Sequence, residues 1–296
     1  MRPSEAWGLL REAVNAWIED HVPSMGAALA YYTVFSIAPM LLIAIAVAGL
    51  VFGVDAARGE IVAQLRGLMG EEGARAIEAL VKSAAKPVEG LTATVVAALM
   101  LLVGATTVFV ELQSALDRIW RAPVQRHEGI LALLRSRLLS FGMVMGVGFL
   151  LTVSLVLSAA VAVLGKFWGA HLGGWLLVAE ALNFVVGLAL VTLMFGLIYK
   201  IMPRVPVRWR DVWIGAAFTA VLFVIGKALI GLYIGRSGIA SGFGAAGSLV
   251  VLLLWVYYSA QIFLLGAEFT RMVARRRAHL AIRREPAQSG MRASSS

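Results

Sequence analysis

Long uninterrupted apolar stretches dominate the pattern of this chain. Residues 90–110, 138–165 and 237–267 carry no formal charge, and about 20 such residues suffice for a helix to cross a bilayer. Six spans are predicted, over residues 28–52, 91–110, 138–164, 175–199, 212–234 and 246–270. Unpaired backbone groups are not tolerated in hydrocarbon, and these runs lack the alternation of barrel strands. The sequence therefore predicts an all-α polytopic membrane protein, a bundle of six transmembrane helices.

Amphipathic segments flank these spans. Residues 4–20 place Trp7, Leu10, Val14 and Trp17 at helical spacing, which predicts an interfacial helix within a cytoplasmic segment 1–24. Between the first two spans, residues 55–86 repeat apolar positions with helical spacing and are broken at Gly70. This pattern predicts an outer amphipathic helical hairpin within a transmembrane domain of residues 25–270.

The end of the chain is basic and then rich in small residues. Residues 271–296 hold seven of the arginines and finish in a Pro-, Gly- and Ser-containing stretch. We expect a disordered cytoplasmic tail that serves first as a positive anchor. A site for anionic lipids in this tail is the alternative use of the same charges.

The charge distribution sets the expected orientation. The chain has 26 lysines and arginines against 17 acidic residues; 18 of the basic residues fall in segments on one side of the predicted spans and 7 on the other. Because cytoplasmic loops carry the excess of Lys and Arg, both termini are predicted to be cytoplasmic. Trp209 and Trp213 fall at a predicted cytoplasmic end, the headgroup level that indoles prefer.

Composition also removes several classes of chemistry. The chain has no cysteine, so it forms no disulfide and offers no thiolate for metal binding or catalysis. Its four histidines are scattered, and we expect no metal site. Gly242, Gly244 and Gly247 form a G-x-G-x-x-G pattern, but it lies between two spans instead of in a βαβ unit, so no cofactor is expected. The basic charge is assigned to orientation, and no nucleic-acid partner is expected.

Two ionisable residues lie near the outer ends of predicted spans. Glu180 lies in the fourth span and Lys227 in the fifth, each a few residues from the outer end. A charge within a span is costly unless it is paired or hydrated, so we predict that the two side chains form an ion pair. A structural pair and a step in a solute or proton path both remain open.

A second polar group is predicted toward the cytoplasmic half. Tyr257, Gln261 and Glu268 share one face of the sixth span at i, i+4 and i+11. Polar or bending positions in the first two spans join them in the hypothesis, namely Tyr32, Ser36, Pro39 and Glu111. We predict that these residues border a cytoplasm-facing polar cavity. Three alternatives stay open: Glu111 pairs with Arg118, Glu268 pairs with Arg271, and Tyr257 only packs.

Three segments resemble a known family. They are AALAYYTVFSIAP at 27–39, ELQSALDRIW at 111–120 and GSLVVLLLWVYYSAQIFLLGAE at 247–268, and they resemble the YihY/BrkB family of bacterial inner-membrane proteins. The resemblance implies a six-helix membrane protein and adds Gln113 to the candidate cavity residues. Members have been labelled ribonuclease BN or linked to virulence, and neither label identifies a reaction.

These observations favour transport in the inner membrane. We expect a transporter or flippase-like protein that moves a solute or an amphipathic, lipid-linked molecule through the polar cavity. A membrane scaffold or regulatory protein is the alternative, and we expect no enzymatic activity, including that of a ribonuclease. Membrane lipids are expected partners, and a homo-oligomer is compatible with the sequence.

Overall fold

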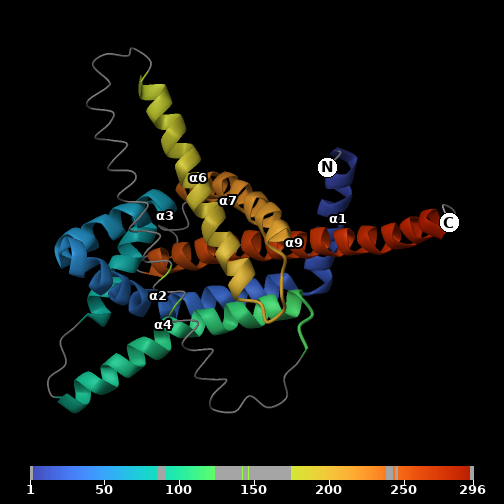
Figure 1. Cartoon of the computed structure of the whole chain (residues 1–296). Coiled ribbons are helices and arrows are strands. Elements are labelled where there is room, and N and C mark those ends of the chain that lie inside the picture. The colour runs from blue at the N-terminus through green and yellow to red at the C-terminus, as the bar shows by residue number, and fades with distance from the viewer. Residues whose placement is uncertain are drawn as a thin grey trace.

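The structure is a computed structural model that describes residues 3–85, 91–123, 142, 146, 175–237, 243 and 246–293. Across this part of the chain the regular structure is helical and contains no strand. The helices with printed labels in Figure 1 are α1 (Pro3–Glu19), α2 (Val22–Phe52), α3 (Val54–Ala84), α4 (Leu91–Ile119), α6 (Trp175–Ile201), α7 (Trp209–Ser237) and α9 (Gly247–Ala293).

Five helices, α2, α4, α6, α7 and α9, are long and apolar enough to cross a membrane. Their apolar stretches overlap five of the six predicted spans. The third predicted span, residues 138–164, lies outside the described residues except for Gly142 and Gly146, which are helical. The structure thus confirms an all-helical architecture with several membrane helices, while the count of six stays a prediction.

Helix α9 is the central element of the described bundle. It runs through the molecule beside α2, and α7 packs along it (Figure 1). Helix α4 lies against α2, and α6 lies against α7. Helix α1 meets α9 at the end of the molecule that carries both labelled termini (Figure 1).

Buried hydrogen bonds and small residues join α6, α7 and α9. The Tyr199 hydroxyl of α6 donates to the carbonyl oxygen of Phe263 at 2.6 Å and lies 3.0 Å from the Thr219 hydroxyl of α7. Gly266 leaves the space that these two hydroxyls occupy, and Gly215 of α7 leaves space for Thr270 in the same way. Small residues let membrane helices approach closely, so this three-helix contact is tight and polar at its centre.

The connection between α2 and α4 has the predicted break. Helix α3 consists of two helical halves joined at Gly70, whose φ of 79° and ψ of 179° only glycine adopts readily. The second half buries Ile77 and Val81 in an apolar cluster with Leu41 of α2 and Leu252 of α9. The second half of α3 is therefore packed onto the bundle.

The N-terminal helix docks on the middle of α9. Leu9 and Ala13 of α1 pack with Phe269 and Val273 of α9, and Trp7 on the other face of α1 is 70% exposed. The helix α9 continues to Ala293, so the structure has helix where the sequence suggested a disordered tail. Alanine, arginine and leucine favour helix, and contact with α1 stabilises the first turns of this extension.

Candidate functional site

One face of α9 carries a line of polar side chains. Tyr257, Gln261 and Glu268 share this face, as predicted from their spacing, and the helical period adds Arg271 and Arg275. These five residues, here called the α9 polar face, extend over about 27 Å of helix. Leu264, which is fully buried, interrupts the line between Gln261 and Glu268. The polar face therefore has an inner part around Gln261 and an outer part beyond Glu268.

A buried ion cluster forms the outer part. The guanidinium of Arg271, only 5% exposed, lies 3.2 Å from the Glu268 carboxylate and 3.4 Å from the Asp20 carboxylate. It also donates a hydrogen bond of 2.5 Å to the carbonyl oxygen of Ile119. Arg121 donates to the other Asp20 oxygen at 2.7 Å. The cluster joins the turn between α1 and α2, the end of α4 and the helix α9.

Two residues with a left-handed backbone conformation position the side chains of this ion cluster. His21, with φ 54°, separates α1 from α2 directly after Asp20. Arg121, with φ 53°, follows the last turn of α4, where the amide of Ala122 donates to the carbonyl of Asp117 at 2.9 Å. Such a bond across a left-handed residue is how helices commonly end. Each of these two helix ends thus presents a charged side chain, Asp20 or Arg121, to α9.

The inner part of the polar face lies against α2. The Gln261 amide fills the space left by Gly26 and lies 3.4 Å from the Pro23 carbonyl oxygen. Its own carbonyl oxygen is buried without a hydrogen bond among the described residues, and so is the hydroxyl of Ser36. Ser36 lies ten residues beyond Gly26, or about 15 Å along the helix. The structure therefore separates Ser36 from Gln261 along α2 and does not gather Ser36, Gln261 and Glu268 at one point.

The remaining predicted cavity residues lie at several different contacts. Pro39 packs against Gly104 of α4, and Tyr32 is half-buried beside Tyr31. Tyr257 is half-buried next to the apolar cluster of α2, α3 and α9. Gln113 points elsewhere, because its amide donates at 3.1 Å to the carbonyl of Met202, after α6.

Glu111 lies at a separate small cavity. This cavity of about 170 Å³ lies between α2 and α4, and Arg118 and Ser24 also line it. The pairing of Glu268 with Arg271 that the sequence left open is present in the structure. Lys227 is half-buried on α7, while the side chain of Glu180 is outside the described part of the structure. The pair of these two residues stays a prediction.

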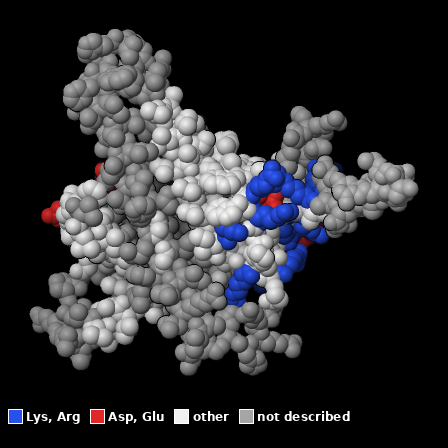
Figure 2. Space-filling view, viewed as in Figure 1, with Lys and Arg blue, Asp and Glu red and all other residues white. Residues whose placement is uncertain are grey.

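Basic side chains gather at one end of the molecule, which we call the basic end. Figure 2 shows Lys and Arg concentrated where α1 meets the C-terminal part of α9. Arg277 of α9 lies 2.5 Å from Asp211 at the start of α7. Trp209 and Trp213 stack beside it, both close to half exposed. Exposed indoles next to arginines are typical of the headgroup level of a membrane.

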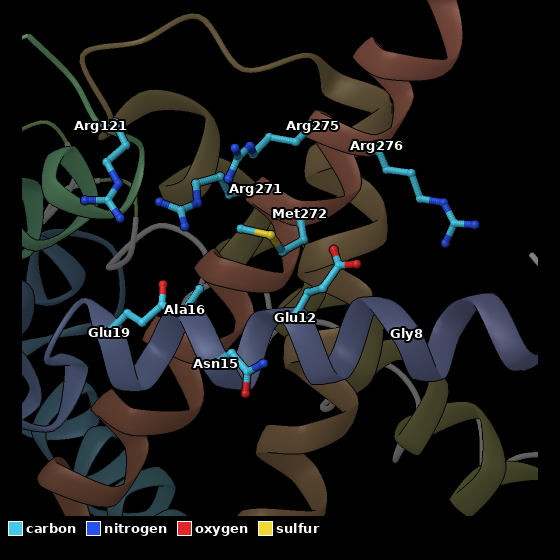
Figure 3. Close-up of a pocket in the computed structure, with 10 residues that line it drawn as sticks. All are labelled: Gly8, Glu12, Asn15, Ala16, Glu19, Arg121, Arg271, Met272, Arg275 and Arg276. Carbon is cyan, nitrogen blue, oxygen red and sulfur yellow. The ribbon is translucent and has the colours of Figure 1, made fainter. Parts of the chain in front are cut away.

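A large open cavity lies at the basic end, and we call it the vestibule. Its volume is about 800 Å³, and it lies between α1 and α9 beside Arg121, which follows α4. Its lining residues, shown in Figure 3, are Gly8, Glu12, Asn15, Ala16, Glu19, Arg121, Arg271, Met272, Arg275 and Arg276. One wall is acidic and comes from α1, and the other is basic and comes mainly from α9. The outer part of the α9 polar face opens into this cavity.

The sequence alone did not identify Asp20 or Arg121 as site residues. It named Arg271 only as a possible partner of Glu268, which lies three residues earlier on the same face. Asp20 and Arg121 carry no such signal, because only the two left-handed turns bring them together.

Comparison with known proteins identifies the family. A family model described as virulence factor BrkB matches residues 13–290. UPF0761 membrane proteins of Pseudomonas aeruginosa (strain LESB58) and Verminephrobacter eiseniae (strain EF01-2) are 30% identical over 87% and 88% of this chain, which spans 60% of the length of each. No solved structure matches. Together with its membrane helices and its three family-like segments, the match shows that this chain belongs to the BrkB family of membrane proteins.

Proposed function

We propose that the protein is an inner-membrane transporter or flippase-like protein that moves a solute or an amphipathic, lipid-linked molecule. The route follows the seam between α2 and α9 and ends in the vestibule at the cytoplasmic face. Leu264 closes this route in the conformation described here, because it is fully buried between Gln261 and the ion cluster. Passage therefore requires α9 to move relative to α2.

The observation that carries this proposal is a set of buried polar atoms on α2 and α9. The Ser36 hydroxyl, the Gln261 carbonyl oxygen and the Arg271 Nε have no hydrogen bond among the described residues. Leaving one such atom unsatisfied costs about 1–3 kcal/mol. A seam that served only for packing would gain from apolar residues at these positions, whereas a transport path uses spare donors and acceptors to bind its cargo.

The basic end supports the cytoplasmic placement of the vestibule. Arg121, Arg271 and Arg275 line it, and Arg204 and Arg208 lie in the connection between α6 and α7 that reaches the same end. The positive-inside rule assigns such an end to the cytoplasm.

Reconstitution in liposomes tests the proposal. Full-length protein is incorporated into vesicles that carry a fluorescent phosphatidylethanolamine, and dithionite is added outside. Transport predicts that the inner-leaflet probe is also bleached, and that Gln261→Met slows this phase because it removes the spare amide at nearly constant volume. Ser259→Ala, which alters the opposite face of α9, is the matched control. Bleaching no faster than in protein-free vesicles, or equal rates for wild type and Gln261→Met, contradicts this function.

A scaffold or regulatory role is the second candidate, and the exposed face of α1 favours it. Trp7, Val14 and Ile18 are exposed and fall within one narrow stripe of the helix. An apolar stripe of this kind docks on a lipid surface or on a partner. A scaffold predicts no probe movement in liposomes without its partner, so the same measurement separates the two roles.

A further inference from the structure

The two walls of the vestibule carry opposite charge. From α9 come Arg271 and Arg275, with Arg121 next to them at the end of α4; from α1 come Glu12 and Glu19. Figure 3 shows Glu12 and Glu19 extending from α1 toward the arginine-bearing wall, so the acidic and basic groups face the same open space. A ligand with both a negative and a positive group complements this arrangement better than a simple anion does.

The basic wall has more hydrogen-bond donors than acceptors. The contacts of Arg271 with Glu268, Asp20 and Ile119 engage its two Nη atoms, and its buried Nε has no hydrogen bond among the described residues. Arg121 and Arg271 share the single carboxylate of Asp20, so two guanidinium groups with five donors each meet one acceptor side chain there. Guanidinium groups suit phosphate, because their planar donor pairs match its oxygens.

The position of the vestibule along α9 fits a binding site for a phosphate at the membrane surface. Arg271 lies about 36 Å along α9 from Gly247, where the helix begins, and the hydrocarbon core of a bilayer is about 30 Å thick. The ion pair of Arg277 with Asp211 brings the same part of α9 to the start of α7, where Trp209 is exposed. These residues therefore lie near the headgroups, where phosphates of lipids are found.

We propose that the vestibule binds an amine-bearing phosphate group, such as the phosphoethanolamine headgroup of a phospholipid. Arg271, Arg275 and Arg121 hold the phosphate, and Glu12 and Glu19 hold the ammonium group. The inference names the chemistry of the cargo and thus rests on the proposed function, but binding is measured without transport.

Binding to the purified full-length protein in detergent tests the site. The probes are monomeric short-chain phosphatidylethanolamine, short-chain phosphatidylglycerol, free phosphoethanolamine and inorganic phosphate. We expect saturable binding of the phosphatidylethanolamine, weakened about tenfold by Arg275→Gln, the usual effect of losing one charge-assisted hydrogen bond. Arg210→Gln, which removes an exposed charge that is not among the vestibule-lining residues, is the matched control.

A separate double variant tests the acidic wall. The double variant Glu12→Gln and Glu19→Gln is expected to weaken phosphatidylethanolamine binding and to leave phosphatidylglycerol binding equal or tighter. Both residues are exposed on α1, so the variant folds without loss of core contacts. Equal binding of the two lipids by the wild type, or equal losses in Arg275→Gln and Arg210→Gln, overturns the proposal.

The remaining arms identify the source of the phosphate and separate the two proposals. Tighter binding of the lipid than of free phosphoethanolamine supports a headgroup, whereas equal binding supports a soluble phosphoamine at the same site. Binding of inorganic phosphate as tight as that of phosphoethanolamine overturns the role of the acidic wall. Headgroup binding without probe movement in liposomes refutes transport and leaves the site standing, and probe movement without headgroup binding does the reverse.

Discussion

Arg271 is the residue on which the basic end depends. It is buried and compensates two buried acidic groups, Glu268 on α9 and Asp20 in the turn between α1 and α2. Taking such charges out of water is costly, so each is tolerated only while its partners remain. Arg271 therefore holds α9 to the turn between α1 and α2.

Removing Arg271 should therefore destabilise the fold strongly. We expect Arg271→Met to cost about 3–5 kcal/mol, the usual loss when one partner of a buried pair is removed. Adding Glu268→Gln to it should restore part of this loss, because the stranded charge is gone. Arg75→Met, which breaks an exposed pair with Glu71, should cost less than about 1 kcal/mol. Unfolding in detergent followed by intrinsic fluorescence measures all three, and similar losses for Arg271→Met and Arg75→Met would refute the assignment.

At the scale of helices, packing depends on where glycines meet side chains. Gly266 of α9 faces the hydroxyls of Thr219 and Tyr199, so the space for a methyl group is already filled. Gly187 of α6 has no described heavy atom within 4 Å of the same position. These two helical glycines thus differ in their role, and the neighbouring helix determines the role of each.

Gly266→Ala is expected to separate α9 from α6 and α7. The added methyl group displaces the buried Tyr199 and Thr219 hydroxyls, and we expect a loss of about 1–3 kcal/mol. Gly187→Ala should be neutral or stabilising by up to about 1 kcal/mol, because alanine favours helix and open space receives the methyl group. Melting temperatures of the two variants in the same detergent test this, and a Gly266→Ala variant as stable as wild type would contradict the contact.

At the scale of the whole molecule, orientation is the property to test. The chain has no cysteine, so single cysteines report membrane sidedness directly. We expect Arg275→Cys to react with an impermeant maleimide only from the cytoplasmic side, and Gly59→Cys on α3 only from the outer side. Labelling of both from the same side would refute the topology.

The sequence predicts the helices better than it predicts the site. Apolar runs and their lengths locate five spans that the structure also has, and Gly70 marks the break in α3. The spacing of Gln261 and Glu268 correctly predicts a shared face. The vestibule could not be predicted, because it requires α1 to dock on α9 through Leu9 and Ala13. The helical spacing predicts a different apolar face, with Trp7 and Val14, which is exposed in the structure.

The carboxylate of Asp20 contacts arginines that lie 101 and 251 positions later in the chain. During synthesis this acid is therefore made long before the buried arginine that completes its surroundings. A growing chain can pair Asp20 with Arg121 early, but the final arrangement waits until α9 has been made. The helix α1 consequently reaches its native position only when α9 has been inserted, and a chain that stops short of Arg271 leaves this contact unformed.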